Sequence, residues 1–365
     1  MTCREKKRGR RKSRWFITRD LRGVKKRRRR VVARNTHRNL QISNHFGFFN
    51  RLTLFKSGTY TERMLKRRAF VVVLSLAACA LAWPGPLTAQ AIQRALYVSV
   101  LDQAGTPVPN LGPADFVVRE DNVSREVLKV EPASEPMHVA VIVDNSQAAR
   151  DEIPHIRQAL PAFIAALTGS AAGDVKNEVA IIAIGERPTI FATSTTSRTS
   201  LQKGVDRLWS LPGTGAYLLD GIIEVCQGFK KREALRPVIV AISAEGPELS
   251  NRQYDQVLDP LRASGAAFHV IAIGRSSDIL SDEARNRSIV LDQGPRTTGG
   301  HREDLLTGMA LTATLTQLAA ELTHQYRVTY ARPQTLIPPE RVTVASAKPG
   351  LTARGTLVKD QQGRP

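Results

Sequence analysis

The chain has 365 residues, and 53 Lys and Arg against 33 Asp and Glu give it a formal net charge of +20. Residues 1–68 hold 24 of the basic and 3 of the acidic side chains, so the 29 basic and 30 acidic side chains that remain nearly cancel. The body of the chain therefore lacks the basic excess typical of nucleic-acid-binding proteins, and its length predicts two or three domains with a large core.

Residues 1–63 are rich in basic clusters such as "KKRGRRK" and have no sustained hydrophobic periodicity. Such a segment buries too little apolar surface to fold alone. We expect it to be disordered, or to be upstream sequence translated ahead of a physiological start at Met64. The alternative is a basic arm that binds nucleic acid or a membrane surface.

Residues 64–91 have the three parts of a bacterial-type signal peptide. A short basic segment precedes a 15-residue apolar run, Ala69–Trp83, and small residues follow the helix-breaking "PGP". The run is shorter than a spanning helix requires. We therefore predict export to the periplasm, the cell surface or the medium, with cleavage after Ala89 or Ala91. The alternative is a lipoprotein acylated at Cys79, since "LAAC" resembles a lipobox.

Residues 92–136 alternate apolar and polar side chains over short stretches between turn signals, which predicts a small β module. From residue 137 the pattern changes. Four continuous apolar runs, "HVAVIVD", "EVAIIAIG", "PVIVAIS" and "FHVIAIG", alternate with amphipathic segments. Strands that are covered on both faces have this pattern, so residues 137–331 are predicted to form a doubly wound, mostly parallel α/β sheet. Residues 332–365 are predicted to be a C-terminal β tail.

In a doubly wound sheet, ligands bind beyond the carboxyl ends of the strands. The first strand of the predicted sheet ends in Asp144, with Ser146 after it. The loop "LPGTGAYLLDG" contributes Thr214, and the strand that ends at Ser243 is followed by Glu245 and Glu248. These side chains are the candidates for a site.

The ordered set of these loops resembles the von Willebrand factor A domain. The flanking segments "LYVSVLDQAGTPVPNLGPADFVVREDN", "RTTGGHRED" and "LAAELTHQYRVTYARP" are similar to a bacterial von Willebrand A-related family described mainly from acidobacteria. The resemblance covers residues 94–358. It implies a metal-ion-dependent adhesion site that binds Mg²⁺ or a similar cation through an Asp, two Ser hydroxyls, a Thr and a water-bridged Asp.

Carried over to this chain, the site consists of Asp144, Ser146 and Thr214. Ala148 stands where the family has its second Ser, and Ala244 or Glu245 stands where it has the later Asp. Because three ligands supply too little of an octahedral shell, the sequence predicts a degenerate site that binds a divalent cation weakly or not at all.

Other interpretations of these side chains do not involve a metal. Asp144, Ser146 and Thr214 are residue types that cap helices, and "PGTG" is also typical of a tight turn. For Glu245 and Glu248 we expect a solvated loop. We expect His301 at the surface and Cys226 in the core. The remaining histidines of the body, His138, His155, His269 and His324, lack metal-ligand spacing.

No sequence motif of an enzyme accompanies these candidates. We therefore expect a binding protein without catalysis, which contacts an unidentified protein partner and takes no small-molecule substrate. A purely structural scaffold without a ligand site is the alternative.

Overall fold

The computed structural model describes residues 91–169, 176–275, 281–334, 337, 339 and 341–358. The basic segment 1–63, Cys79 and all but the last residue of the predicted signal peptide lie outside the described residues. Within the described ranges, no helix combines the length and the apolar character needed to cross a membrane.

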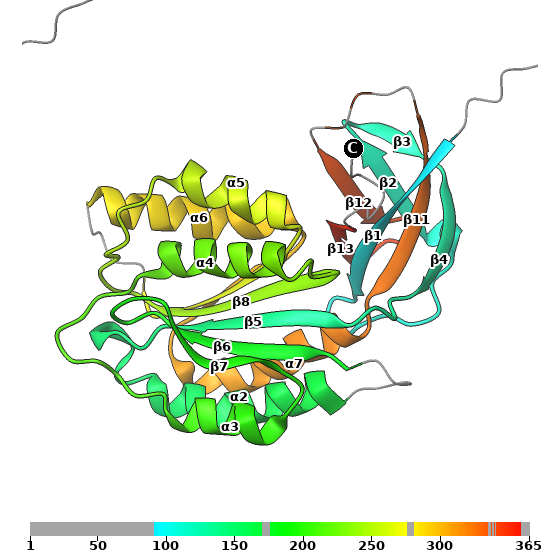
Figure 1. The fold of residues 1–365 in the computed structure, drawn as a ribbon. Coiled ribbons are helices and arrows are strands. Elements are labelled where there is room, and N and C mark those ends of the chain that lie inside the picture. Colours follow the sequence, from blue (N-terminus) through cyan, green and yellow to red (C-terminus); the bar gives the residue numbers. More distant parts are fainter. Residues whose placement is uncertain are drawn as a thin grey trace, which may run out of the picture. The chain divides into compact units, whose positions relative to one another are not determined.

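A mostly parallel sheet forms the centre of the fold (Figure 1). Its strand order is β10-β9-β8-β5-β6-β7, and only β7 runs antiparallel to its neighbour. Order along the sheet reverses between β5 and β8, as in doubly wound folds. The fold class predicted from the apolar runs is thus confirmed. The strands are β5 (Met137–Val143), β6 (Glu178–Ala183), β7 (Thr189–Thr195), β8 (Arg236–Ala244), β9 (Ala267–Ile273) and β10 (Arg302–Leu305).

Helices cover both faces of this sheet (Figure 1). One face packs against α2 (Ile153–Gly169), α3 (Arg198–Asp206) and α7 (Leu311–Thr323), and the other against α4 (Leu218–Lys231), α5 (Tyr254–Ser264) and α6 (Asp282–Thr298). In β5, Val139 and Val141 enter the first core whereas Ala140 and Ile142 enter the second. Because side chains alternate along a strand, a continuous apolar run serves both cores.

Strands from both ends of the described chain form a separate β unit. One sheet has the order β13-β1-β11-β4 and a second has the order β12-β2-β3. Their buried residues, among them Leu96, Val98, Phe116 and Val328, share a third core. The strands are β1 (Ala91–Leu101), β2 (Phe116–Glu120), β3 (Val123–Arg125), β4 (Val127–Pro132), β11 (Tyr326–Pro333), β12 (Val342–Ser346) and β13 (Thr352–Leu357), and the short helices are η1 (Pro113–Asp115), η2 (Gln147–Ala149) and η3 (Gly308–Ala310).

Buried polar contacts join this β unit to the α/β sheet. The guanidinium of Arg236, at the start of β8, donates to the Leu322 carbonyl at 2.7 Å and to Gln325 Oε1 at 2.6 Å. It also lies 5.1 Å from the ring centre of Tyr97 in β1. The Thr356 hydroxyl of β13 donates to the Thr298 carbonyl at the end of α6. These bonds hold the two parts together where β11, β1 and β13 approach α6 and α7.

Candidate functional site

Three loops meet at the carboxyl edge of the central sheet. They follow β5, precede α4 and follow β8. The amide of Leu211 donates to the Asn145 carbonyl at 2.9 Å, and the amide of Gln147 donates to the Thr214 carbonyl at 3.3 Å. The fold therefore places the loop of Asp144 and Ser146 directly against the loop of Thr214, at the edge that the sequence indicated.

The carboxylate of Asp144 is buried and makes its hydrogen bonds within the protein. One oxygen accepts from the Ser146 amide at 2.9 Å, in an Asx turn. The other accepts from the Ala244 amide at 3.2 Å and from the Ser243 hydroxyl at 3.5 Å. Asp144 thus ties the loop after β5 to the end of β8.

The hydroxyls of Ser146 and Thr214 do not cap helices. Ser146 precedes η2, but its side chain makes no capping bond, and the Oγ atom is buried without a hydrogen-bond partner. Thr214 Oγ1 donates to the Leu211 carbonyl at 2.9 Å, while Tyr217 stands at the start of α4. The tight-turn interpretation of "PGTG" agrees with this bond and with the positive φ of Gly213. The capping interpretation of these two hydroxyls was wrong.

The positions that the resemblance assigns to further ligands hold Ala148, and Ala244 or Glu245. Ala148 supplies no donor atom, and Ala244 is the buried last residue of β8. Glu245 Oε2 forms an ion pair with Arg287 Nη1 at 3.3 Å. Arg287 reaches in from α6, and its other terminal nitrogen donates to the Ala244 carbonyl at 2.8 Å and to Ser243 Oγ at 3.1 Å.

These side chains do not fit Mg²⁺, which requires a near-octahedral set of oxygen ligands. Both Asp144 oxygens already accept hydrogen bonds, and Ser146 offers the one unpaired hydroxyl among the three predicted ligands. The guanidinium of Arg287 contacts Ser243, which in turn contacts Asp144. A protein side chain thus supplies the positive charge beside this edge.

Glu248 does not lie on a solvated loop as we expected. Only 4% of it is exposed, because its backbone pairs with Ala216 beside the start of α4. Its Oε1 accepts from the Ser250 amide at 3.1 Å, and its Oε2 is buried without a hydrogen-bond partner. Burial raises the pKa of this carboxyl to about 7, against the hydrogen bonds from Ser250 and the charge of Arg287, which lower it. The expectation for Glu245 was also wrong, since its carboxylate is largely buried in the pair with Arg287.

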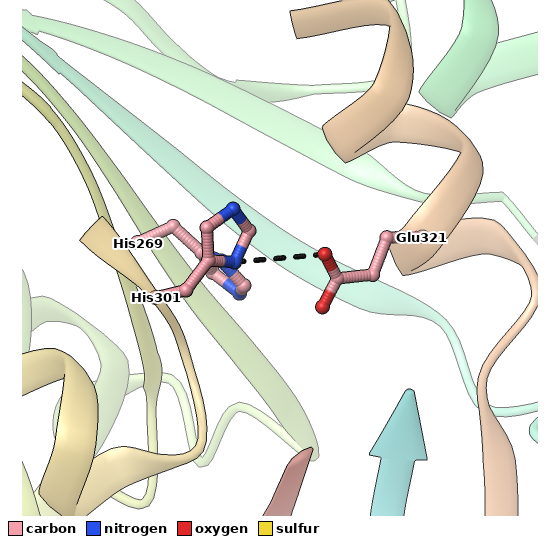
Figure 2. Close-up of side chains that lie close together, drawn as sticks. All are labelled: His269, His301 and Glu321. Carbon is pink, nitrogen blue, oxygen red and sulfur yellow. Dashed lines mark hydrogen bonds and ion pairs between the residues drawn. The ribbon is translucent and has the colours of Figure 1, made fainter. Parts of the chain in front are cut away.

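A second cluster of polar side chains lies near the amino ends of β9 and β10, where α7 faces the β unit. His269 of β9, His301 before β10 and Glu321 of α7 place their ligand atoms within 4.8 Å of one another (Figure 2). We expected His301 at the surface, and this prediction was wrong, because its side chain is only 16% exposed. His269 is not isolated from the other histidines either. Sequence spacing gives no sign of this cluster, because strand pairing and helix packing bring the three residues together. Cys226, in contrast, is buried in the core as predicted.

Comparison with known proteins concerns the fold. No protein-family model and no curated protein matched the sequence. Among solved structures, a von Willebrand factor type A protein from Catenulispora acidiphila is similar over 75% of this chain and 74% of its own, with 11% identity and a TM-score of 0.41. The von Willebrand A domain of SpRpn10 is similar over 50% of this chain and 94% of its own, with 14% identity and a TM-score of 0.38.

A third similar structure is proximal thread matrix protein 1 from the mussel byssus, described with zinc in its metal-ion-dependent adhesion site. It covers 56% of this chain, has 12% identity and a TM-score of 0.42, and the chain spans half of its length. At such identities the likeness concerns the fold alone. The assignment to the doubly wound class rests on the strand order itself.

Proposed function

We propose that this is an exported binding protein that contacts a protein partner through the carboxyl edge of its central sheet, without a resident metal ion. The proposal rests on one observation. Large apolar side chains are exposed in loops at this edge of the sheet: Trp209 is 56% exposed, Leu249 46%, Leu306 73% and Met309 77%. We call these four residues the apical surface.

Local contacts support the placement of the four side chains at one edge. The Trp209 carbonyl accepts from Asn145 Nδ2 at 3.2 Å, and the Leu249 amide donates to the Ala216 carbonyl. Leu306 directly follows β10, and Met309 lies in η3, whose Gly308 amide donates to Glu152 Oε2. Because the carboxyl ends of parallel strands share one edge, the loops that follow them lie together.

Large apolar side chains that are exposed together are typical of protein-binding surfaces. Trp is the residue type most often found at the energetic centre of an interface, with Tyr and Arg. Metal-free binding is supported by the hydrogen bonds of Asp144 and by Arg287, which supplies a positive charge beside Glu245.

Site-specific photocrosslinking in the native organism tests the surface. A photoreactive residue at Met309 or Leu249 should capture the same protein, whereas one at Ile190, which is 58% exposed but lies on the edge strand β7, should not. With that partner purified, Trp209→Ala should weaken binding about tenfold or more. The affinity should be the same in EDTA as in excess Mg²⁺.

Three results would count against this proposal. Capture at Ile190 but not at Met309 would place the interface elsewhere, and loss of binding in EDTA would show a metal-dependent contact. A stable homo-oligomer whose contacts avoid the apical surface would favour the structural scaffold. Cell fractionation decides the question of export separately, since a protein confined to the cytoplasm contradicts that part alone.

A further inference from the structure

Register in the central sheet places two histidines side by side. Arg302 of β10 pairs with Val270 of β9 in parallel, so His301 and His269, one position earlier on each strand, are neighbours. Along β9, His269 points to the same face as Ala267 and Ile271, which is the face that α7 covers. Glu321 faces this point from α7, next to the buried Leu318 and Leu322 (Figure 2).

Distances between the three side chains match those of metal ligands. His269 Nδ1 lies 3.1 Å from His301 Nδ1, and His301 Nδ1 lies 3.5 Å from Glu321 Oε2. Zinc bonds of about 2.0–2.2 Å at tetrahedral angles place neighbouring ligand atoms about 3.3 Å apart. Two imidazoles and one carboxylate are also a ligand set that open zinc sites use.

Both imidazoles are neutral at neutral pH, so each ring has one nitrogen with a free lone pair. Burial, together with the charge of Arg354, lowers the pKa of His301 to about 4. Burial also lowers the pKa of His269, with smaller effects from His301 and Arg354. A metal ion binds the neutral imidazole, so no imidazolium has to lose a proton first. Because Arg354 donates to His301 Nδ1, the proton of the Nδ1–Nδ1 contact belongs to His269, and metal binding requires that it move from Nδ1 to Nε2. His269 Nε2 is buried without a hydrogen-bond partner, so the contact at Nδ1 is the polar contact that this ring makes in the structure.

An arginine supplies the positive charge at this cluster in the structure. Arg354 Nη1 of β13 lies 3.2 Å from His301 Nδ1 and 3.4 Å from Glu321 Oε2. The Ser99 hydroxyl also bonds to Glu321, whose pKa burial raises and Arg354 lowers. Arg354 is 28% exposed in its side chain and lines a cavity of about 420 Å³ together with His301, Glu321 and Glu303. The guanidinium therefore has room to move toward Glu303, and a metal ion has a path to the cluster.

Glu303 lies beside the outer nitrogen of His301. Its Oε1 lies 3.7 Å from His301 Nε2, the ring nitrogen that faces away from the cluster. This distance is longer than a hydrogen bond. If the carboxylate closes to hydrogen-bond distance when a metal binds, it fixes the ring's tautomer and raises the basicity of the other nitrogen.

We propose that His269, His301 and Glu321 form a binding site for Zn²⁺, with a fourth position open to the cavity, and that the metal ion displaces the guanidinium of Arg354. Nitrogen-rich ligand sets select Zn²⁺ over Mg²⁺ and Ca²⁺, which prefer oxygen. Arg354 belongs to β13, so its ion pair with Glu321 joins the β unit to α7. Zinc binding would break this ion pair and leave a metal centre whose three ligands all belong to the α/β domain.

Calorimetric titration of the purified, tag-free protein with Zn²⁺ tests the proposal, and Co²⁺ gives the visible absorption of a tetrahedral complex. We expect one ion per chain. Arg354→Met should tighten binding about tenfold or more, because it removes a like charge from the cluster. Glu303→Gln should weaken binding about tenfold, and Glu321→Gln and His301→Gln should weaken it by about 100-fold or more.

The matched control is His324→Gln, an exposed histidine at the end of α7 that should leave zinc affinity unchanged. Asp144→Ala separates this site from the carboxyl edge, because zinc binding should survive it. Circular dichroism shows which variants fold, and Arg354→Met tests the site even where Glu321→Gln does not fold. The proposal fails if neither the wild type nor Arg354→Met binds zinc, or if folded Glu321→Gln and His301→Gln bind it as tightly as the wild type.

Discussion

Glu248 shows how one buried carboxyl makes the stability of the molecule depend on pH. In the unfolded chain its pKa is near the ordinary 4.5, and burial raises it to about 7 in the fold. Between these two values the folded protein holds a proton that the unfolded chain has released. Stability therefore falls as pH rises through this window, and the loss is complete above the pKa of the folded state.

Glu248→Gln, which mimics the protonated side chain, should remove this dependence. As pH rises from 5 to 8, the free energy of unfolding of the variant should increase relative to that of the wild type, by at most about 3 kcal/mol. Urea denaturation at four pH values in that range measures the difference. If the difference between the two proteins stays constant from pH 5 to 8, Glu248 does not titrate as its burial predicts.

At the end of α6, Gly299 and Gly300 pass so close to neighbouring strands that there is no space for a side chain. A Cβ atom at Gly300 would lie 1.9 Å from the Phe268 carbonyl oxygen, and one at Gly299 would lie 2.1 Å from the Gly355 carbonyl oxygen. Gly299 also ends α6 with a φ of +80°. The pair lets the chain pass between β9 and β13 and brings His301 beside His269.

Gly300→Ala should destabilise the fold by about 3 kcal/mol, since the backbone of β9 cannot move aside without breaking its pairing with β8 and β10. Thermal and urea denaturation measure the loss. The control is Gly228→Ala in α4, where a Cβ meets nothing within 4 Å. Alanine favours a helix by about 0.5–1 kcal/mol over glycine, so this variant should be more stable than the wild type. A Gly300→Ala protein as stable as the wild type would contradict the close packing at this position.

The sequence predicted the strands whose burial pattern is regular and missed two edge strands of the central sheet. The apolar runs identified β5, β6, β8 and β9, because strands covered on both faces contain little else. The edge strands β7 ("TIFATST") and β10 ("REDL") were not predicted, since solvent on one side admits polar residues. Asp144 could be found because it ends a recognisable strand. Arg287 could not, because its role depends on how α6 packs against residues 44 positions away.

At the scale of the whole molecule, Arg236 connects parts of the chain that lie far apart in sequence. Its guanidinium bonds to the carbonyls of Glu135 and Leu322 and to Gln325, and it stacks on Tyr97. Burial lowers its pKa to about 10, so it stays charged at neutral pH. Hydrogen bonds to a buried charge are among the strong ones in proteins.

Arg236→Leu should lower the free energy of unfolding by about 3 kcal/mol and separate the unfolding of the β unit from that of the α/β domain. Tryptophan fluorescence at Trp209 and far-ultraviolet circular dichroism would then give different urea midpoints. Arg262→Leu removes an exposed ion pair with Asp259 and should cost less than about 1 kcal/mol. A single shared transition in Arg236→Leu, with an unchanged midpoint, would contradict the role of this contact.

Pairing of β1 with β11 and β13 has a consequence for synthesis. On the ribosome, β1 emerges more than 200 residues before either of its neighbours, Tyr326–Pro333 and Thr352–Leu357. An unpaired strand exposes a row of backbone donors and acceptors that can pair with another chain. The α/β domain can form as its segments appear, whereas the β unit has to wait for the last strand. A stop codon after Pro333 and before Thr352 would thus leave β1 with an open edge, and such truncated chains should aggregate although all of the α/β domain is present.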